Sequence, residues 1–396
     1  MLSLASCSGG VAVLGGDIEI SDIHVEPDTL DYTGIQGFAA QLFAAAAAAD
    51  DKNVSISPVS AYIALSMAAS GAEGSTARAF SSLLGLEGTE LLSVCRAMAE
   101  TYGGLTGSTV FHVANAAWAA PSVNLRDNFM QNLKDYFSAD LYTVDLSSNS
   151  FLKSVNQWVN HNTDDMIPEF LKEPLSEESV ILLVNVLCME AKWSEPFQAD
   201  QTVLRWFQME DGSKAQVNFL TGEAANRSYF KTDTAEGVIL PYDDGRLAFM
   251  AFRSVSDRNI SGLVSDFTAD TLSSYLDSAV KRRVLLSMPV LNLDYSINLN
   301  HILKNLGLEI AYDSAKANFS GMADSEGLFI SDVLQTVHLA VDEEGTMAAA
   351  ATSEVSDTSS PTDYIELLFD SPYGWAVIDL KTGVPVFTGI VDNPML

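Results

Sequence analysis

Three short motifs in this sequence of 396 residues contain the residue types of a serine acyl-transfer site. They are an S-x-x-K match at Ser150–Lys153, an S-x-N match at Ser296–Asn298 and a K-T-G match at Lys381–Gly383. In that order they are motifs of a penicillin-recognising enzyme. However, Ser150 follows a polar loop instead of lying in a buried helix, and Lys381–Gly383 also fits a turn between two apolar strands. We therefore assign no catalysis to these residues.

Cysteine and histidine, the other common nucleophiles and metal ligands, show no spacing that indicates a site. Three cysteines do not make a disulfide framework, and no histidine pair has metal-ligand spacing. The sequence also contains no G-x-S-x-G motif and no phosphate-binding glycine loop. It therefore predicts a protein that is not an enzyme and that uses no metal and no cofactor. The cysteines and histidines are Cys7, Cys95, Cys188, His24, His112, His161, His301 and His338.

The composition is strongly acidic, with a formal net charge of -31. Nucleic acids and anionic membranes are bound through Lys and Arg, so neither is expected as the main partner. The chain is 47% hydrophobic, which is enough for a large core, and no Gly/Ser/Pro linker divides its middle. The alanine-rich stretch Phe38–Ala49 is too short to span a bilayer. We expect one large domain without a transmembrane segment.

The N-terminus permits two interpretations. Leu4–Cys7, followed by Ser8–Gly10, matches the end of a bacterial lipoprotein signal, with Cys7 as the lipidated residue, although its basic and most of its apolar region are missing. The other interpretation is an ordinary terminal tail. We predict that residues 1–28 are a tail and that Cys7 is a lipid anchor. The protein is then extracellular or at the cell surface, while a cytoplasmic location stays open.

Apolar periodicity predicts helices early in the chain and strands late, without a βαβ rhythm, which is an α+β pattern. A strand at 180–192 is apolar throughout and is expected to be buried on both faces of a large sheet. The predicted helices are 34–49, 58–70, one after Gly74, 126–137, 152–170, 268–278 and 301–306. The predicted strands are a short one at the start of the stretch 53–60, then 110–119, 141–146, 180–192, several within 201–252, 284–289, 295–299, 334–341, 374–380 and 384–391.

One stretch near the C-terminus has unusual chemistry. An acidic pair, Glu343 and Glu344, precedes Gly345 and Thr346, and four alanines follow at Ala348–Ala351. Such small, uncharged side chains can enter a tight space without overpacking or large desolvation. After them come small and polar residues to Thr362, with neither helical nor strand periodicity. The stretch is typical of a segment that can change its location.

This stretch resembles the hinge of the inhibitory serpins, the suicide-substrate protease inhibitors. Further matches follow in the family's order and cover about residues 35–394. The resemblance implies the serpin fold, with a large central, mostly antiparallel β-sheet, further sheets, about eight or nine helices and an exposed reactive-centre loop. The sequence resembles that of a bacterial member of the family, and we expect a monomer. The further matches are Asn53–Ser60, Gly71–Thr76, Val184-Asn185, Lys192–Phe197, Phe319–Met322, Ile330–Val333, Phe369–Tyr373 and Phe387–Pro394.

The resemblance also implies a mechanism and a domain layout. A single domain at 29–396 would carry its reactive-centre loop at about 343–365. A serine protease forms an acyl-enzyme with the loop, the cut loop enters the sheet as a new strand, and the distorted protease stays trapped. The alternative is a non-inhibitory serpin, a carrier, a chaperone-like protein or a plain substrate. The hinge residues would be Glu343, Glu344, Gly345, Thr346, Ala348, Ala349, Ala350 and Ala351.

In the family, a polar cluster under the sheet controls its opening. The matching residues are Ser55, Ser57, Ser60 and Asn185, with Gln335 where the family usually has a histidine. Glutamine can bridge Ser and Asn as donor and acceptor, but it cannot titrate. Trp193 matches the aromatic residue at the top of the sheet, where insertion begins.

Counting from Gly345 as in most inhibitory members gives the reactive bond Ser359–Ser360. Thr358–Ser359, or a bond nearer Thr362, stays open because the segment is slightly long. All these residues are small and uncharged, which suits an elastase-like or subtilisin-like protease and not a trypsin-like one. Alternation from Thr346 turns Glu354 inward on insertion, which is costly for an unpaired carboxylate.

Overall fold

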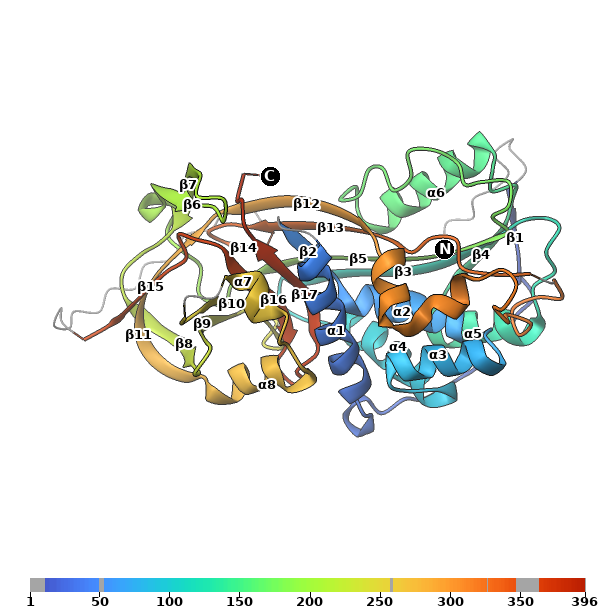
Figure 1. The fold of residues 1–396 in the computed structure, drawn as a ribbon, viewed down its shortest axis with the longest axis horizontal. Helices are drawn as coiled ribbons and strands as arrows, with labels where there is room; N and C mark the ends of the chain where they lie inside the picture. Colours follow the sequence, from blue (N-terminus) through green and yellow to red (C-terminus); the bar gives the residue numbers. More distant parts are fainter. Residues whose placement is uncertain (1–10, 50–52, 257–258, 326, 347–362, 396) are drawn as a thin grey trace.

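A central sheet of long strands runs through the molecule (Figure 1). The computed structural model describes residues 11–49, 53–256, 259–325, 327–346 and 363–395. The two longest strands of the sheet, β3 and β5, are antiparallel neighbours, and the strand order is β1-β4-β3-β5-β14. These strands are β1 (Ala12–Val13), β3 (Val110–Ala119), β4 (Asp140–Thr143), β5 (Ile181–Lys192) and β14 (Gly345–Thr346).

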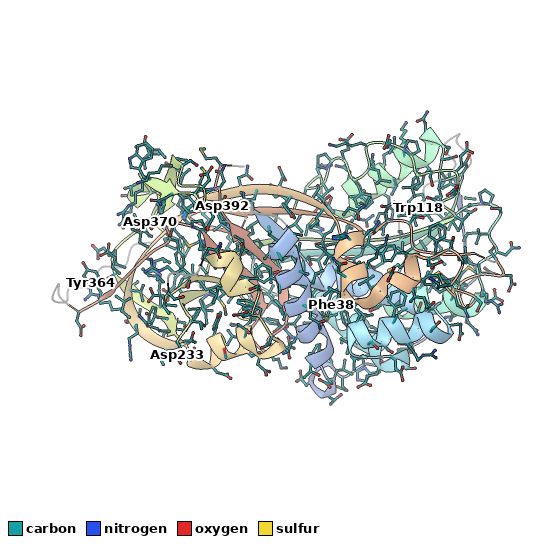
Figure 2. All side chains as sticks on the ribbon, in the orientation of Figure 1. Phe38, Trp118, Asp233, Tyr364, Asp370 and Asp392 are labelled. Carbon is teal, nitrogen blue, oxygen red and sulfur yellow. The ribbon has the colours of Figure 1, made fainter. Side chains whose placement is uncertain are left out.

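Strand β5 is covered on both faces, as its apolar sequence predicted. Leu187, Met189 and Ala191 pack into the main core. Val186 and Cys188, on the other face, pack in a second cluster with Trp118 and helix α6 (Asn149–Asn162). Figure 2 shows Trp118 in this second cluster, where its ring stacks on Tyr142 with centroids 4.3 Å apart, while Phe38 lies in the main core. Side chains added beside β5 must therefore fit one of two packed layers.

Beside β5, on the side away from β3, lies a separate two-stranded ribbon. It consists of β12 (Leu291–Asn298) and β13 (Leu334–Val341), paired along their whole length. Within the described residues, β13 forms no ladder with β5, although the two contact each other. Residues 342–344 connect β13 to β14, which lies against the far end of β5. The central sheet therefore has a place for a strand, which the described residues fill only at one end.

A second sheet of ten strands makes up the other end of the molecule (Figure 1). Its order is β2-β17-β16-β10-β9-β8-β11-β7-β6, and β15 pairs with β11. Its strands are β2 (Val54–Ile56), β6 (Val203–Gln208), β7 (Lys214–Leu220), β8 (Ala225–Lys231), β9 (Ala235–Pro241), β10 (Leu247–Ser254), β11 (Val280–Pro289), β15 (Ile365–Leu368), β16 (Tyr373–Asp379) and β17 (Pro385–Val391).

Nine α-helices occur in the described residues, and some of them begin at a residue whose side chain caps the helix. In α2, Pro58 is the first helical residue and the Ser57 side chain accepts from the backbone N–H of Ser60. Helices α2 to α5 lie under the central sheet and α6 lies over its other face (Figure 1). Besides α6, they are α1 (Thr33–Ala49), α2 (Pro58–Ala69), α3 (Gly74–Leu84), α4 (Gly88–Gly103), α5 (Asp127–Phe137), α7 (Ile260–Val264), α8 (Ala269–Ser278) and α9 (Asn300–Leu303).

Two helices differ from the prediction. Helix α6 ends at Asn162 and not near Phe170. The reason is local: the Thr163 hydroxyl donates to the Val159 carbonyl and accepts from the Ile167 N–H, and the next two residues have positive φ. Helix α4, between glycines at both ends, was not predicted. No helix of the described ranges is long and apolar enough to cross a membrane.

The N-terminal segment also differs from its prediction as a tail. Residues 11–28 lie against the domain, where Ala12 pairs with Thr143 of the edge strand β4. The Ser21 N–H donates to the Asp135 carboxylate at 2.8 Å, and Asp28 pairs with Lys381. An edge strand has free backbone groups, and β1 satisfies some of them. Cys7, the proposed lipid anchor, lies outside the described residues.

Candidate functional site

Two residues of the predicted hinge already form a strand in the central sheet. Gly345 pairs with Lys192 and Thr346 pairs with Ala191, antiparallel to β5. Thr346 is only 3% exposed. A Cβ on Gly345 would lie 2.0 Å from the Ala191 carbonyl oxygen, so only glycine permits this close approach. Gly345 and Thr346, the two hinge residues of this strand, are thus seated in the sheet of the uncut protein.

The acidic pair before this strand is bonded and not free in solvent. The Glu344 carbonyl accepts from the Trp193 N–H at 2.8 Å, and the Glu343 carbonyl accepts from the Phe197 N–H at 2.7 Å. The Glu343 carboxylate accepts from the Thr202 hydroxyl, and Glu344 lies 3.7 Å from the Lys192 ammonium. These contacts hold the chain entering β14 against the end of β5.

Trp193 lies where insertion was predicted to begin. Its indole N–H donates to the Asp342 carbonyl at 2.9 Å. Its ring stacks on Tyr242, with centroids 4.9 Å apart and planes 6° from parallel. The Tyr242 and Thr346 hydroxyls form a buried hydrogen bond of 2.8 Å. Burial raises the pKa of Tyr242 well above its ordinary value, so this hydroxyl stays protonated and can donate or accept.

Tyr242 is a site residue that the sequence interpretation missed. It begins the turn Tyr242–Gly245, within 201–252, where the sequence predicted only several strands. In the structure its backbone N–H donates to the Leu247 carbonyl, and the N–H of Asp243 donates to the Lys192 carbonyl. The turn therefore binds the end of β5. A tyrosine directly before a turn at Asp243–Gly245 was the only signal for it.

Gln335 lies in the predicted sheet-opening cluster, but its contacts differ in part from those expected. Its side-chain carbonyl accepts from the Ser57 N–H at 2.9 Å, and its amide donates to the Ser57 carbonyl at 2.8 Å. The Ser57 hydroxyl donates to Val386 and caps helix α2. Gln335 therefore joins β13 to the start of α2 through backbone groups. Ser60 is buried there, and the buried Ser55 hydroxyl has no partner in the described part of the chain.

Asn185 forms a different link from the one expected. Its side-chain N–H₂ donates to the Asn115 side-chain oxygen at 2.8 Å, and Asn115 donates in turn to the Phe137 carbonyl at the end of α5. Asn115 was not identified from the sequence, although an asparagine in a buried strand is itself a signal. The Asn185 side-chain oxygen is buried without a partner in the described part of the chain. It is an unused acceptor.

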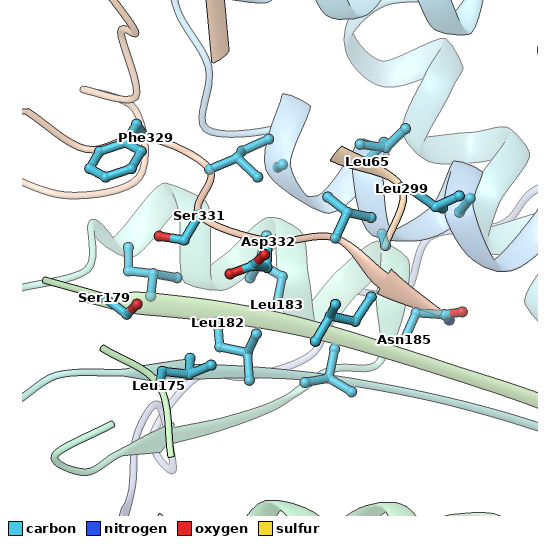
Figure 3. A pocket seen from close by; sticks show the side chains of 18 of the residues that line it. Leu65, Leu175, Ser179, Leu182, Leu183, Asn185, Leu299, Phe329, Ser331 and Asp332 are labelled. Carbon is cyan, nitrogen blue, oxygen red and sulfur yellow. The ribbon is translucent and has the colours of Figure 1, made fainter. Parts of the chain in front are cut away.

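A cavity of about 100 Å³ lies along the first half of β5, at the end away from β14. Figure 3 shows Leu183 and Asn185 on β5 and the chain with Ser331 and Asp332 across from them. The remaining lining is mostly apolar and comes from α2 and from the residues leading to β13. A cavity of this volume is too small for a strand of several residues. A strand can enter only if β5 and β13 separate.

The described contacts do not join the three motifs of the acyl-transfer pattern. The Ser150 hydroxyl bonds to Ser148 at the start of α6, and the Ser296 hydroxyl bonds to Thr336 on β13. Lys381–Gly383 forms the turn between β16 and β17, as predicted, where Asp379 accepts from the Lys381 N–H. Burial raises the pKa of the Cys95 and Cys188 thiols to about 12. Within the described ranges, no group of His, Cys, Asp or Glu could hold a metal ion.

Part of the predicted site lies outside the described residues. This part comprises Ala348, Ala349, Ala350, Ala351, Thr358, Ser359 and Ser360. The described chain resumes at 363 and enters β15, which pairs in parallel with β11 from Ile365 onward. The loop is thus held at β14 on one side and at β15 on the other.

Comparison with known proteins accounts for this arrangement. A family profile described as "Serpin (serine protease inhibitor)" matches residues 33–394. Neuroserpin of Mus musculus is 26% identical over 357 residues, which cover 87% of each chain. The native structure of the thermophilic serpin tengpin superposes with a TM-score of 0.90 at 25% identity, covering 97% of this chain and 100% of that one.

The family contains more than one kind of activity. The fold is also that of a thyroxine-binding globulin solved in complex with thyroxine, with a TM-score of 0.80, 21% identity and coverage of 91% and 99%. Serpins are generally protease inhibitors and not catalysts, and their usual targets are serine proteases. The α+β serpin fold predicted from the sequence is confirmed, and this chain belongs to the serpin family.

Proposed function

We propose that this serpin is a suicide-substrate inhibitor of serine proteases that traps its target by inserting the cut loop between β5 and β13. The observation that carries the proposal is β14. It is antiparallel to β5, as an inserted strand must be, and β13 has no ladder partner on that side within the described residues. Cutting the loop frees the residues after Thr346 to extend this strand.

The register of β14 supports the proposal. Extended along β5 in steps of two, it places Ala348 opposite Met189 and Ala350 opposite Leu187, both on the main-core face. Directly opposed residues of an antiparallel pair point to the same face, so methyl groups would meet packed apolar side chains. This is what a rapidly entering strand requires, because larger groups would overpack this layer.

The same register gives Thr352 a specific partner. Thr352 falls opposite Asn185, whose side-chain oxygen is buried and has no partner among the described residues. A threonine hydroxyl at that position can donate to this oxygen. Two residues further on, Glu354 falls opposite Leu183, so a carboxylate would face the core. Insertion is therefore favourable as far as Thr352 and meets a cost after it.

Strand completion supplies enough energy to hold a distorted protease. About twelve inserted residues, at roughly 1 kcal/mol net for each new ladder hydrogen bond, give on the order of 10 kcal/mol before apolar burial is counted. Deacylation stalls if this energy displaces the protease oxyanion hole, because that hole supplies the main stabilisation of the reaction's charged intermediate.

The target we propose is an elastase-like or subtilisin-like protease that acts outside the cell. The proposed reactive bond is Ser359–Ser360, with Thr358–Ser359 as the alternative, and every candidate side chain is small and uncharged. A shallow primary pocket accepts such side chains, whereas a trypsin-like pocket requires Arg or Lys. The inward position of Glu354 supports one competing outcome, in which the protein is cut as a plain substrate.

Mixing the protein with pancreatic elastase and with subtilisin tests the proposal. We expect a band that survives SDS, at the summed mass of protease and inhibitor without the released C-terminal peptide. N-terminal sequencing of that peptide identifies the reactive bond. If both enzymes cut the protein into two fragments and keep their full activity, the inhibitor proposal is wrong and a non-inhibitory serpin is favoured.

A further inference from the structure

The hydrogen bond between Tyr242 and Thr346 lies at the point where the new strand must start. We propose that Tyr242 is a positioning residue that holds the hinge in the uncut protein and so sets how often cutting ends in trapping instead of release. This inference rests on the proposed function and concerns how the efficiency of trapping is controlled.

Several contacts hold the Tyr242 side chain in place, so that its hydroxyl points toward Thr346. The side chain is 0% exposed and stacks on the ring of Trp193, which also contacts Phe249 of β10 in the second sheet. Its backbone forms an isolated bridge with Trp193, and the following residue donates to Lys192. The tyrosine is thus tied to the end of β5, beside the residues that β14 pairs with.

The Tyr242 hydroxyl also restricts which side chains can occupy position 346. Thr346 brings a small side chain with one hydroxyl into a site that is closed on all sides, at 3% exposure. Its Oγ1 lies 2.8 Å from the Tyr242 oxygen, and either group can donate. A side chain of the same shape without a hydroxyl leaves the buried tyrosine unpaired. A charged side chain would have to give up its hydration in this closed site.

The position of Gly345 and Thr346 in the sheet matters because trapping depends on the relative rates of two reactions. After the loop is cut, insertion competes with hydrolysis of the acyl-enzyme. A new strand must first separate β5 and β13 and form its initial pairs before later pairs add stability. In this protein the first pairs, at Gly345 and Thr346, exist before the cut. By holding these first pairs in place, Tyr242 speeds the initial step of insertion.

Tyr242→Phe, Thr346→Val and the double variant test the inference, with Tyr373→Phe as the matched control. Tyr373 is also fully buried, and its hydroxyl has no hydrogen-bond partner in the described part of the chain. The first readout needs no protease: it is hydrogen exchange of the Trp193 amide, which donates to Glu344 only while the hinge is seated. The second is the number of inhibitor molecules consumed per protease trapped.

Each single variant leaves one buried hydroxyl unpaired, so we expect Trp193 exchange to rise about tenfold and more inhibitor to be consumed per trapped protease. The double variant removes both hydroxyls and keeps the shape, so both readouts should return toward the wild type. Tyr373→Phe should change neither. Rescue by the double variant separates a positioning role from a general loss of packing.

Unchanged Trp193 exchange in both single variants overturns the inference, as does a double variant that is worse than either single one. These outcomes are independent of inhibition. If exchange behaves as expected but the wild-type protein traps no protease, the proposed function fails while the hinge contact stands. If trapping occurs with the same stoichiometry in all variants, the inference fails while the proposed function stands.

Discussion

Thr346 shows how far individual residues could be interpreted from the sequence. Its side chain is small and uncharged, so it was predicted to fit into a tight space. Its burial in the sheet agrees with that prediction. Its partner, Tyr242, could not be predicted, because it is 104 positions away and stands where the sequence shows only a turn. Gln335 was predicted to lie near Ser57, but its bonds to the Ser57 backbone depend on how β13 passes α2.

At this scale we predict that Thr346→Arg converts the inhibitor to a substrate. Seating an arginine here would bury an unpaired charge, at a cost of at least about 3 kcal/mol. The SDS-resistant complex with elastase should disappear while cleavage continues. Thr346→Ser, which keeps the hydroxyl, is the control and should retain the complex. Complex formation by the arginine variant at the wild-type level would refute the insertion mechanism.

At the scale of elements, most strands were predictable because their apolar pattern is continuous. Strands β3 and β13 have the predicted bounds, and β5 begins one residue later than expected. The N-terminal segment was not predictable, since the pairing of β1 depends on the free edge of β4 and not on its own short sequence. The end of α6 depends on one hydroxyl, that of Thr163, and periodicity alone does not reveal it.

The register between β14 and β5 predicts that Glu354 limits insertion. Glu354→Ala replaces a carboxylate that would face Leu183 with a methyl group. We expect fewer inhibitor molecules consumed per trapped protease, measured by titrating elastase activity. Glu366→Ala is the matched control, because Glu366 is exposed on β15 and outside the inserted stretch. An equal effect of both variants, or none from Glu354→Ala, would show that the extended register is wrong.

At the scale of the whole molecule, the central sheet of the uncut protein is incomplete. Within the described residues, β12 and β13 form their own ribbon with no ladder to β5, and a small apolar cavity lies beside the first half of β5. This incompleteness could not be predicted from strand patterns, because β5 and β13 have the same pattern whether or not a strand separates them. The family resemblance implied it, and the structure agrees with a sheet that can accept one more strand.

An incomplete sheet predicts that cutting the loop stabilises the protein. Insertion should add on the order of 10 kcal/mol to the free energy of unfolding. Calorimetry of the protein before and after cleavage near Ser359 should show a large rise in the unfolding temperature. The Thr346→Arg variant, cut at the same bond, should show a much smaller rise. Equal unfolding temperatures for cut and uncut wild-type protein would contradict a loop that inserts.

The central claim is that the cut loop becomes a strand between β5 and β13, and a crystal structure of the loop-cleaved protein tests it most directly. We predict a strand that continues β14, with Ala350 opposite Leu187 and Thr352 opposite Asn185, donating to its now-paired side-chain oxygen. A cleaved protein in which β14 still ends at Thr346, with the cavity beside Asn185 unchanged, would contradict the account.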